Sequence, residues 1–206
     1  ACVCAREPIP VSPDPRLSWA ALGALTTTQL KGVTATQLAG LSATALANLA
    51  DTQIAAFAST QIAALSATNF SALDATALGA LTAAQLKGVT TTELKGLTAT
   101  ALADLSSTQI GTLATTQLAA LSTTNIAALA TTQVSGLTAA QIGSLSTTNL
   151  AAISPTAVAS LSTTQIAGLS VNQLKGLSVT SFAEFKDTQI AAFASTQIAA
   201  LSATNF

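Results

Sequence analysis

The sequence has no histidine, no methionine and no tyrosine, and only 3% of its 206 residues are aromatic. Without histidine it has no imidazole base and no imidazole metal ligand. Charge is scarce too: 7% of residues are charged and the net charge is −1, whereas a typical globular chain is about 25% charged. Seven basic residues form no patch for nucleic acid, so no nucleic-acid partner is expected. No apolar run approaches the ~20 residues that span a bilayer, so no membrane span is predicted.

The first sixteen residues differ in composition from all that follow. Residues 1–16 hold four of the five prolines and both cysteines, and the prolines predict an extended arm. Cys2 and Cys4 form a lone C-x-C, and the chain has no further cysteine or histidine to complete a zinc site. We therefore predict no metal site and expect either an intermolecular disulfide or two free thiols. Residues 17–25 are interpreted as a junction, in which Trp19 begins a cap over the array or anchors a partner.

Residues 26–206 are one uninterrupted array of eight-residue repeats, here called octads, as in S-T-T-Q-I-A-A-L at 162–169. Position one is mostly Ser or Thr, position three is nearly always Thr, and position four is mostly Gln. Positions five and eight are always Leu, Ile, Val or Phe, and positions six and seven are small or Lys-Gly. Such internal repetition predicts a solenoid.

A continuous helix does not fit the octad. Eight residues at about 100° each rotate the apolar pair by about 80° per repeat, so no apolar stripe forms. A continuous strand fails as well, because positions five and eight would point to opposite faces. The chain must bend once in every octad.

The residues at the bend are typical of helix starts. Ser or Thr followed three residues later by Gln is a capping box, and the apolar residues on either side have hydrophobic-staple spacing. Pro155 directly after Ser154 occupies the first helical position, and Asp51 suits a positive helix end. These signals predict an all-α solenoid of very short capped helices, one per octad, with positions five and eight inside. The alternative is a β-solenoid, which the Thr, Ile and Val residues would suit.

A slower rhythm overlies the octads. Residues other than Gln recur at position four every 24 residues, as at Ala77, Ala101, Asn125 and Asn149. This spacing predicts three to three and a half octads per superhelical turn. A history of duplication explains it equally well, since residues 51–70 recur identically as 187–206.

No pattern of catalytic residues is present. The many hydroxyls have no histidine partner, and the acidic residues are dispersed and form no calcium loop. No phosphate-binding Gly-rich loop occurs. We therefore predict no catalytic residue, no cofactor and no enzymatic activity.

The S-T-T-Q-I-A-A-L unit resembles the Thr/Gln/Ala/Leu octapeptide arrays of long bacterial surface proteins, often described as adhesin-like. The resemblance implies an extracellular or cell-surface rod, stalk or filament subunit. An open apolar end at Phe206 and the arm with Cys2 and Cys4 suggest end-to-end self-association. The alternative function is binding to ice or to another solid or cell surface through the regular Thr array.

Overall fold

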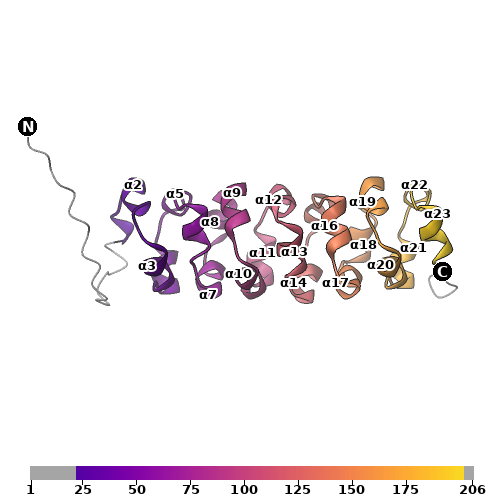
Figure 1. Cartoon of the computed structure of the whole chain (residues 1–206), viewed down its shortest axis with the longest axis horizontal. Helices are drawn as coiled ribbons and strands as arrows, with labels where there is room; N and C mark the ends of the chain where they lie inside the picture. Colours follow the sequence, from indigo (N-terminus) through magenta and orange to yellow (C-terminus); the bar gives the residue numbers. More distant parts are fainter. Residues whose placement is uncertain (1–21, 202–206) are drawn as a thin grey trace, which may run out of the picture.

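The computed structural model describes residues 22–201, which form a long rod (Figure 1). The arm at 1–16 and most of the junction at 17–25 lie outside the described residues. Cys2, Cys4, Trp19 and Phe206 lie outside them too, so the roles predicted for these four residues stay predictions.

Within residues 22–201 the only regular secondary structure is helical, with one helix of four to six residues in each octad. The all-α prediction is confirmed and the β-solenoid alternative is wrong. The helices are α2 (Thr27–Leu30), α3 (Ala35–Ala39), α4 (Ala43–Ala47), α5 (Asp51–Ile54), α6 (Ser59–Ile62), α7 (Ala67–Ser71), α8 (Ala75–Ala80), α9 (Ala83–Gly88), α10 (Thr91–Gly96), α11 (Ala99–Ala103), α12 (Ser107–Thr112), α13 (Thr115–Ala119), α14 (Thr123–Ala127), α15 (Thr131–Ser135), α16 (Ala139–Ser144), α17 (Thr147–Ala152), α18 (Pro155–Val158), α19 (Thr163–Ala167), α20 (Val171–Lys175), α21 (Val179–Ala183), α22 (Asp187–Ile190) and α23 (Ser195–Ala199).

Two extended residues form each corner between helices. Leu113, at position eight, has φ −60° and ψ 142°, and Ala114, at position one, has φ −65° and ψ 153°. Helical geometry resumes at Thr115, the first residue of α13. No described residue has a positive φ, so the corner requires no glycine. The bend therefore arises from an ordinary helix start, as the capping signals predicted.

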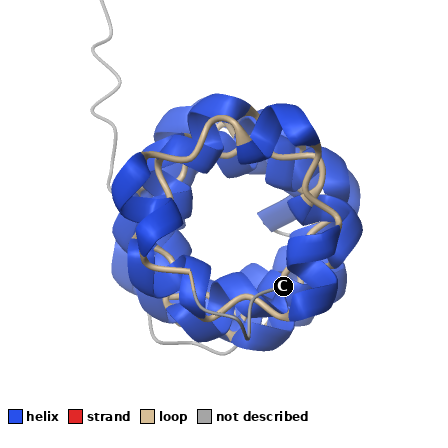
Figure 2. Cartoon of the chain, turned by 90° about the vertical axis from the view of Figure 1, so that its right-hand side faces the viewer, coloured by secondary structure: helices blue, strands red, loops and turns tan. Residues whose placement is uncertain are grey.

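Three octads make one superhelical turn. Each helix packs on the third helix along the chain, as α7 does on α10, α6 on α9 and α14 on α17. Viewed down the rod, the helices form a ring around the axis (Figure 2). The lower value of the predicted range is thus confirmed, and each turn uses 24 residues.

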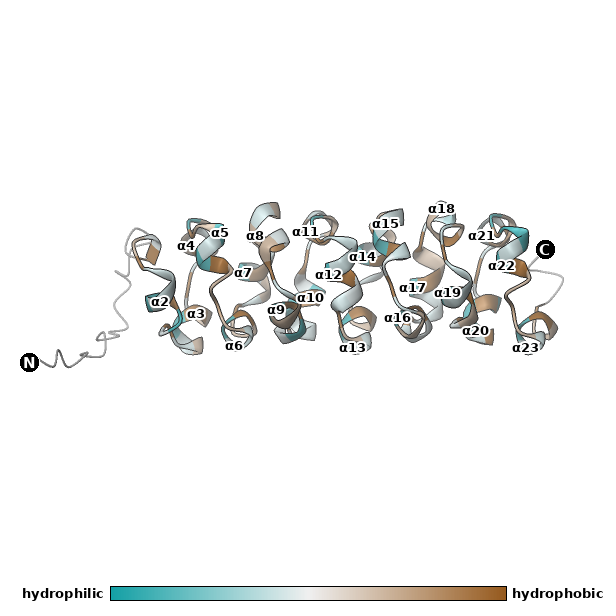
Figure 3. Ribbon diagram, turned by 90° about the horizontal axis from the view of Figure 1, so that it is seen from above, coloured by the Kyte–Doolittle hydropathy of each residue, from teal (hydrophilic) through white to brown (hydrophobic). Residues whose placement is uncertain are grey.

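Large apolar side chains from positions five and eight fill the inside of this ring. Ile110 and Ile166 are completely buried, and Leu65, Leu121 and Leu169 are at most 4% exposed. Hydrophobic residues accordingly lie inward along the whole rod (Figure 3). Because a single short helix is far too small to be stable alone, this continuous core must supply most of the stability.

Small residues at positions six and seven let successive turns approach closely. A Cβ placed on Gly88 would lie 2.7 Å from the main-chain oxygen of Ser59, which is in the helix below. The same approach occurs at Gly136, where a Cβ would lie 2.7 Å from the oxygen of Ser107. Glycine is needed at these two positions for space and not for an unusual backbone angle.

Candidate functional site

The glutamine side chains at position four are buried. Gln133 is 3% exposed and Gln141 is 2% exposed, although an uncharged amide is costly to bury without hydrogen-bond partners. The sequence explained these glutamines only as capping residues of their own helices. Their burial indicates a second role.

Each buried glutamine joins two successive turns. In α15, Oε1 of Gln133 accepts a hydrogen bond from the N–H of Ala130 at 2.9 Å, which satisfies the start of its own helix. Its Nε2 donates to the carbonyl oxygens of Leu102 and Leu105 at 3.0 and 2.6 Å. Leu105 is in the corner that leads into α12, the helix on which α15 packs. We call this paired arrangement the glutamine clamp.

The clamp keeps one register along the rod. In every case Oε1 accepts from the residue three positions earlier, and Nε2 donates to the carbonyl 28 positions earlier. The glutamines that do this are Gln53, Gln61, Gln85, Gln109, Gln117, Gln133, Gln141, Gln165, Gln173, Gln189 and Gln197. The clamp thus recurs as a ladder of amide-to-carbonyl bonds between turns.

Asparagine at position four forms half of the clamp. Nδ2 of Asn125 donates to the carbonyl of Leu97 at 3.0 Å, again 28 residues earlier. Its N-cap, Ser122, instead accepts from the N–H of Asn125 at 3.1 Å. Alanine at this position, as at Ala101, has no polar group to form either bond. The 24-residue rhythm therefore places weaker clamps above one another on the same side of the rod.

One octad has a carboxylate where the others have an amide. Glu93, in α10, is 1% exposed, and its Oε2 accepts from the N–H of Thr90 at 2.5 Å. Its Oε1 is buried and has no hydrogen-bond partner. Burial raises the pKa of the Glu93 carboxyl above its ordinary value, and the hydrogen bonds with Thr90 oppose this shift less strongly.

Threonines at position three form exposed files along the rod. All described residues at this position are exposed, and those 24 residues apart lie on the same side of the solenoid. One file runs unbroken through six threonines: Thr28, Thr52, Thr76, Thr100, Thr124 and Thr148. These files present hydroxyl and methyl groups at regular intervals.

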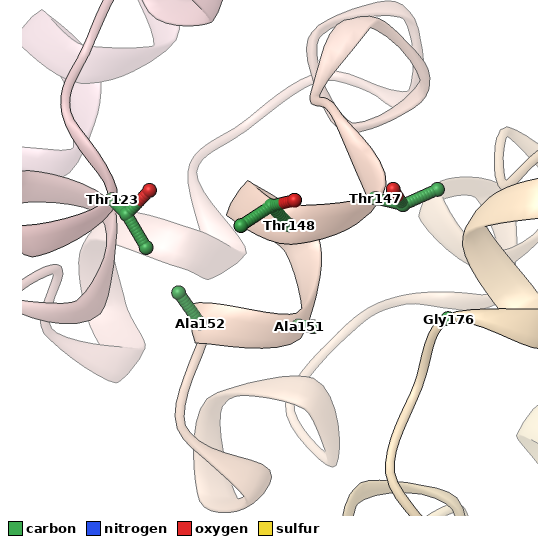
Figure 4. Close-up of a pocket in the computed structure, with 6 residues that line it drawn as sticks. All are labelled: Thr123, Thr147, Thr148, Ala151, Ala152 and Gly176. Atoms are coloured by element: carbon green, nitrogen blue, oxygen red, sulfur yellow. The ribbon is translucent and has the colours of Figure 1, made fainter.

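An open groove of about 500 Å³ lies beside this file, between α14, α17 and α20. Thr123, Thr147 and Thr148 line it with Ala151, Ala152 and Gly176 (Figure 4). The hydroxyl of Thr123 donates to Oδ1 of Asn149 at 3.1 Å. The groove is thus walled by small neutral side chains and holds no charged group.

The described residues assemble no metal or membrane feature. Residues 22–201 contain no group of three or more His, Cys, Asp or Glu side chains placed to hold a metal ion. Within the same residues, no helix has both the length and the hydrophobicity to cross a bilayer. The lysines of the four L-K-G sequences, at 31, 87, 95 and 175, are all exposed near helix ends, where a positive charge is favourable.

Comparison with known proteins identifies the repeat. A family model described as the ALTTAQ repeat matches residues 112–147, which include α13 to α16. The matched segment lies in the middle of the array and has the same octad register as the rest of it. The chain is therefore a repeat-array protein. No curated protein matches the chain.

Proposed function

We propose that the protein is a non-catalytic structural element of the cell surface or the extracellular space: a rod that joins end to end with further copies of itself. The glutamine clamp is the observation that carries this proposal. Every internal turn donates its amides to the turn before it, so the two ends of such a ladder are complementary. A repeated head-to-tail contact of this kind produces a filament.

The first described turn supports the donor half of this contact. Oε1 atoms of Gln29 and Gln37 accept from the N–H groups of Thr26 and Thr34 at 2.9 and 2.6 Å, as in the internal clamps. Among the residues described, their Nε2 atoms donate to no carbonyl, and both side chains are at least partly exposed. These two amides are free to bind corner carbonyls of another molecule.

The last described turn supplies the acceptor half. The corner carbonyls of Phe193 and Leu201 receive no glutamine amide within the described residues. Beside them Ile198 is 43% exposed, although its internal counterpart Ile166 is fully buried. A turn from a second copy would cover this apolar surface and satisfy both carbonyls.

Assembly of the full chain can be measured by sedimentation velocity and negative-stain electron microscopy over a range of concentrations. We expect filaments whose diameter equals that of one rod. Ile198→Asp places a charge in the proposed contact and should abolish them. The matched control is Val179→Asp, since Val179 is also apolar and 52% exposed but lies at position two on the side of the rod.

Each outcome decides the proposal. Circular dichroism should show that both variants keep at least the helix content of the remaining turns. Loss of filaments in Ile198→Asp alone supports the head-to-tail contact. A full-length protein that stays monomeric at high concentration under oxidising conditions, or equal loss in both variants, contradicts it.

The threonine files favour a second function, binding to ice or to another ordered solid. Their uncharged hydroxyl and methyl groups repeat with the superhelical turn, as a lattice-matching surface requires. Thermal hysteresis and adsorption to crystalline polysaccharide would measure this activity. Replacing Thr100 and Thr124 with Asp should remove it and leave filaments intact, whereas Ile198→Asp should do the reverse.

A further inference from the structure

Glu93 occupies a place built for an amide donor. It stands at position four, where the neighbouring octads have Gln85 and Ala101, and α10 packs on α7 as the other helices pack on theirs. The clamp register assigns its second oxygen to the carbonyls 28 and 31 residues earlier, which belong to Leu65 and Ile62. Neither carbonyl receives a side-chain donor in the structure, and Oε1 of Glu93 has no partner.

An ionised carboxylate cannot fill this place, because it only accepts hydrogen bonds and the corner presents only acceptors. A protonated carboxyl has the same shape as glutamine and one O–H donor. We propose that Glu93 is held protonated in the folded rod and donates its O–H to the Leu65–Ile62 corner, which makes this turn a pH-sensitive joint.

No charged group near Glu93 offers an alternative partner. The helices packed against α10, which are α7 and α13, contain no titratable residue, and neither does the corner at 62–65. Lys95, on α10 itself, and Lys87, at the end of α9, are exposed. An ionised Glu93 would thus be buried without a counter-ion and beside carbonyl oxygens, which is costly.

The direction of the pH effect follows from which state binds the proton more tightly. The carboxyl of an unfolded chain titrates near pH 4.3, and burial raises the pKa of Glu93 in the folded rod. The stabilisation from this proton is therefore complete below about pH 4. It is lost as the pH rises through the folded-state pKa. Above that pKa, the turn formed by α7 and α10 becomes the weakest in the array.

The test compares the melting temperature of the full chain with that of Glu93→Gln between pH 4 and pH 8. Gln is the array's own residue, so this variant should fold. We expect equal melting temperatures at pH 4 and a variant that melts about 2–8 °C higher at pH 8. Glu184→Gln removes one charge from an exposed site and serves as the control, which should show no such pH-dependent difference.

The converse variant keeps the test independent of Glu93 itself. Gln165→Glu puts a carboxyl at an intact clamp three turns away, and should lower the melting temperature at pH 8 but not at pH 4. An infrared difference spectrum of the full chain minus Glu93→Gln at neutral pH should contain the carbonyl band of a protonated carboxyl.

Three results would overturn the inference. One is a difference in melting temperature between the full chain and Glu93→Gln that is the same at pH 4 and pH 8. Another is an infrared difference spectrum with only ionised carboxylate bands. The third is stabilisation at pH 8 by sodium, potassium or calcium chloride that requires Glu93, since the corner would then bind a metal cation and not a proton.

Discussion

The side-chain amide of Gln133 lies 2.6 Å from the carbonyl oxygen of Leu105, 28 residues earlier in the chain. The same side chain satisfies the start of its own helix. One residue type therefore both begins each helix and fixes it to the turn below, and variants of this residue should separate the two effects.

Replacing Gln133 with Ala removes both bonds and leaves two buried carbonyls without this donor. We expect the free energy of unfolding to fall by about 1–3 kcal/mol. Gln29→Ala is the control, because Gln29 caps its helix but makes no bond between turns in the described residues. Urea denaturation should show the smaller loss for Gln29→Ala, and equal losses would mean that the bonds between turns contribute nothing.

Adding a hydroxyl at Ala114 should stabilise the rod. Ala114 is an N-cap without a side-chain bond, whereas Ser at this position elsewhere accepts from the third helical N–H, as Ser106 does from Gln109 at 3.2 Å. We expect Ala114→Ser to raise the free energy of unfolding by about 0.5–2 kcal/mol. Ala119→Ser adds the same group at an exposed site inside α13 and should give no gain in thermal or urea melts.

Two glycines of the array should respond in opposite directions to alanine. In Gly88→Ala the new Cβ meets the main chain of Ser59 at 2.7 Å, so the turns must separate, at a cost of about 1–3 kcal/mol. Gly79 has nothing within 4 Å of its added Cβ and lies inside α8. Gly79→Ala should therefore gain up to about 1 kcal/mol from helix propensity. Paired denaturation curves check this, and a loss at both sites would contradict the role assigned to close packing.

Whole octads should be removable where single residues are not. Deleting residues 106–129 removes three octads, or one complete turn, and restores every clamp register across the junction. We expect an unchanged ellipticity per residue and one cooperative melt. Deleting only residues 106–109 shifts positions five and eight off the core, and should give a clear loss of helicity by circular dichroism.

The sequence was sufficient for the local structure and for the core. Pro155, Ser154 and the Ser-to-Gln spacing located the helix starts, because caps are short-range and use residue types that are legible in a sequence. The burial of Ile110 and Leu121 followed from position alone. The 24-residue rhythm gave a range of turn sizes, and only the packing of helices three apart selected one.

The inter-turn role of the glutamines could not be derived in the same way. A capping box already explains Gln at position four, so the sequence gave no reason to seek a second partner for its amide. The signal was present in Glu93, which caps as well as Gln but lacks the amide donor. Recognising it requires the carbonyls of a corner 28 residues away, and that distance depends on the superhelical turn.

The core and the clamps connect each turn to the next along the rod, and this has a mechanical consequence. A pull on the two ends loads these contacts in series, so turns should detach one after another. Each released turn frees three octads and lengthens the chain by up to about 80 Å. Such a rod would yield in small repeated steps under tension and rewind when the load falls, and so limit the force that reaches whatever it is attached to.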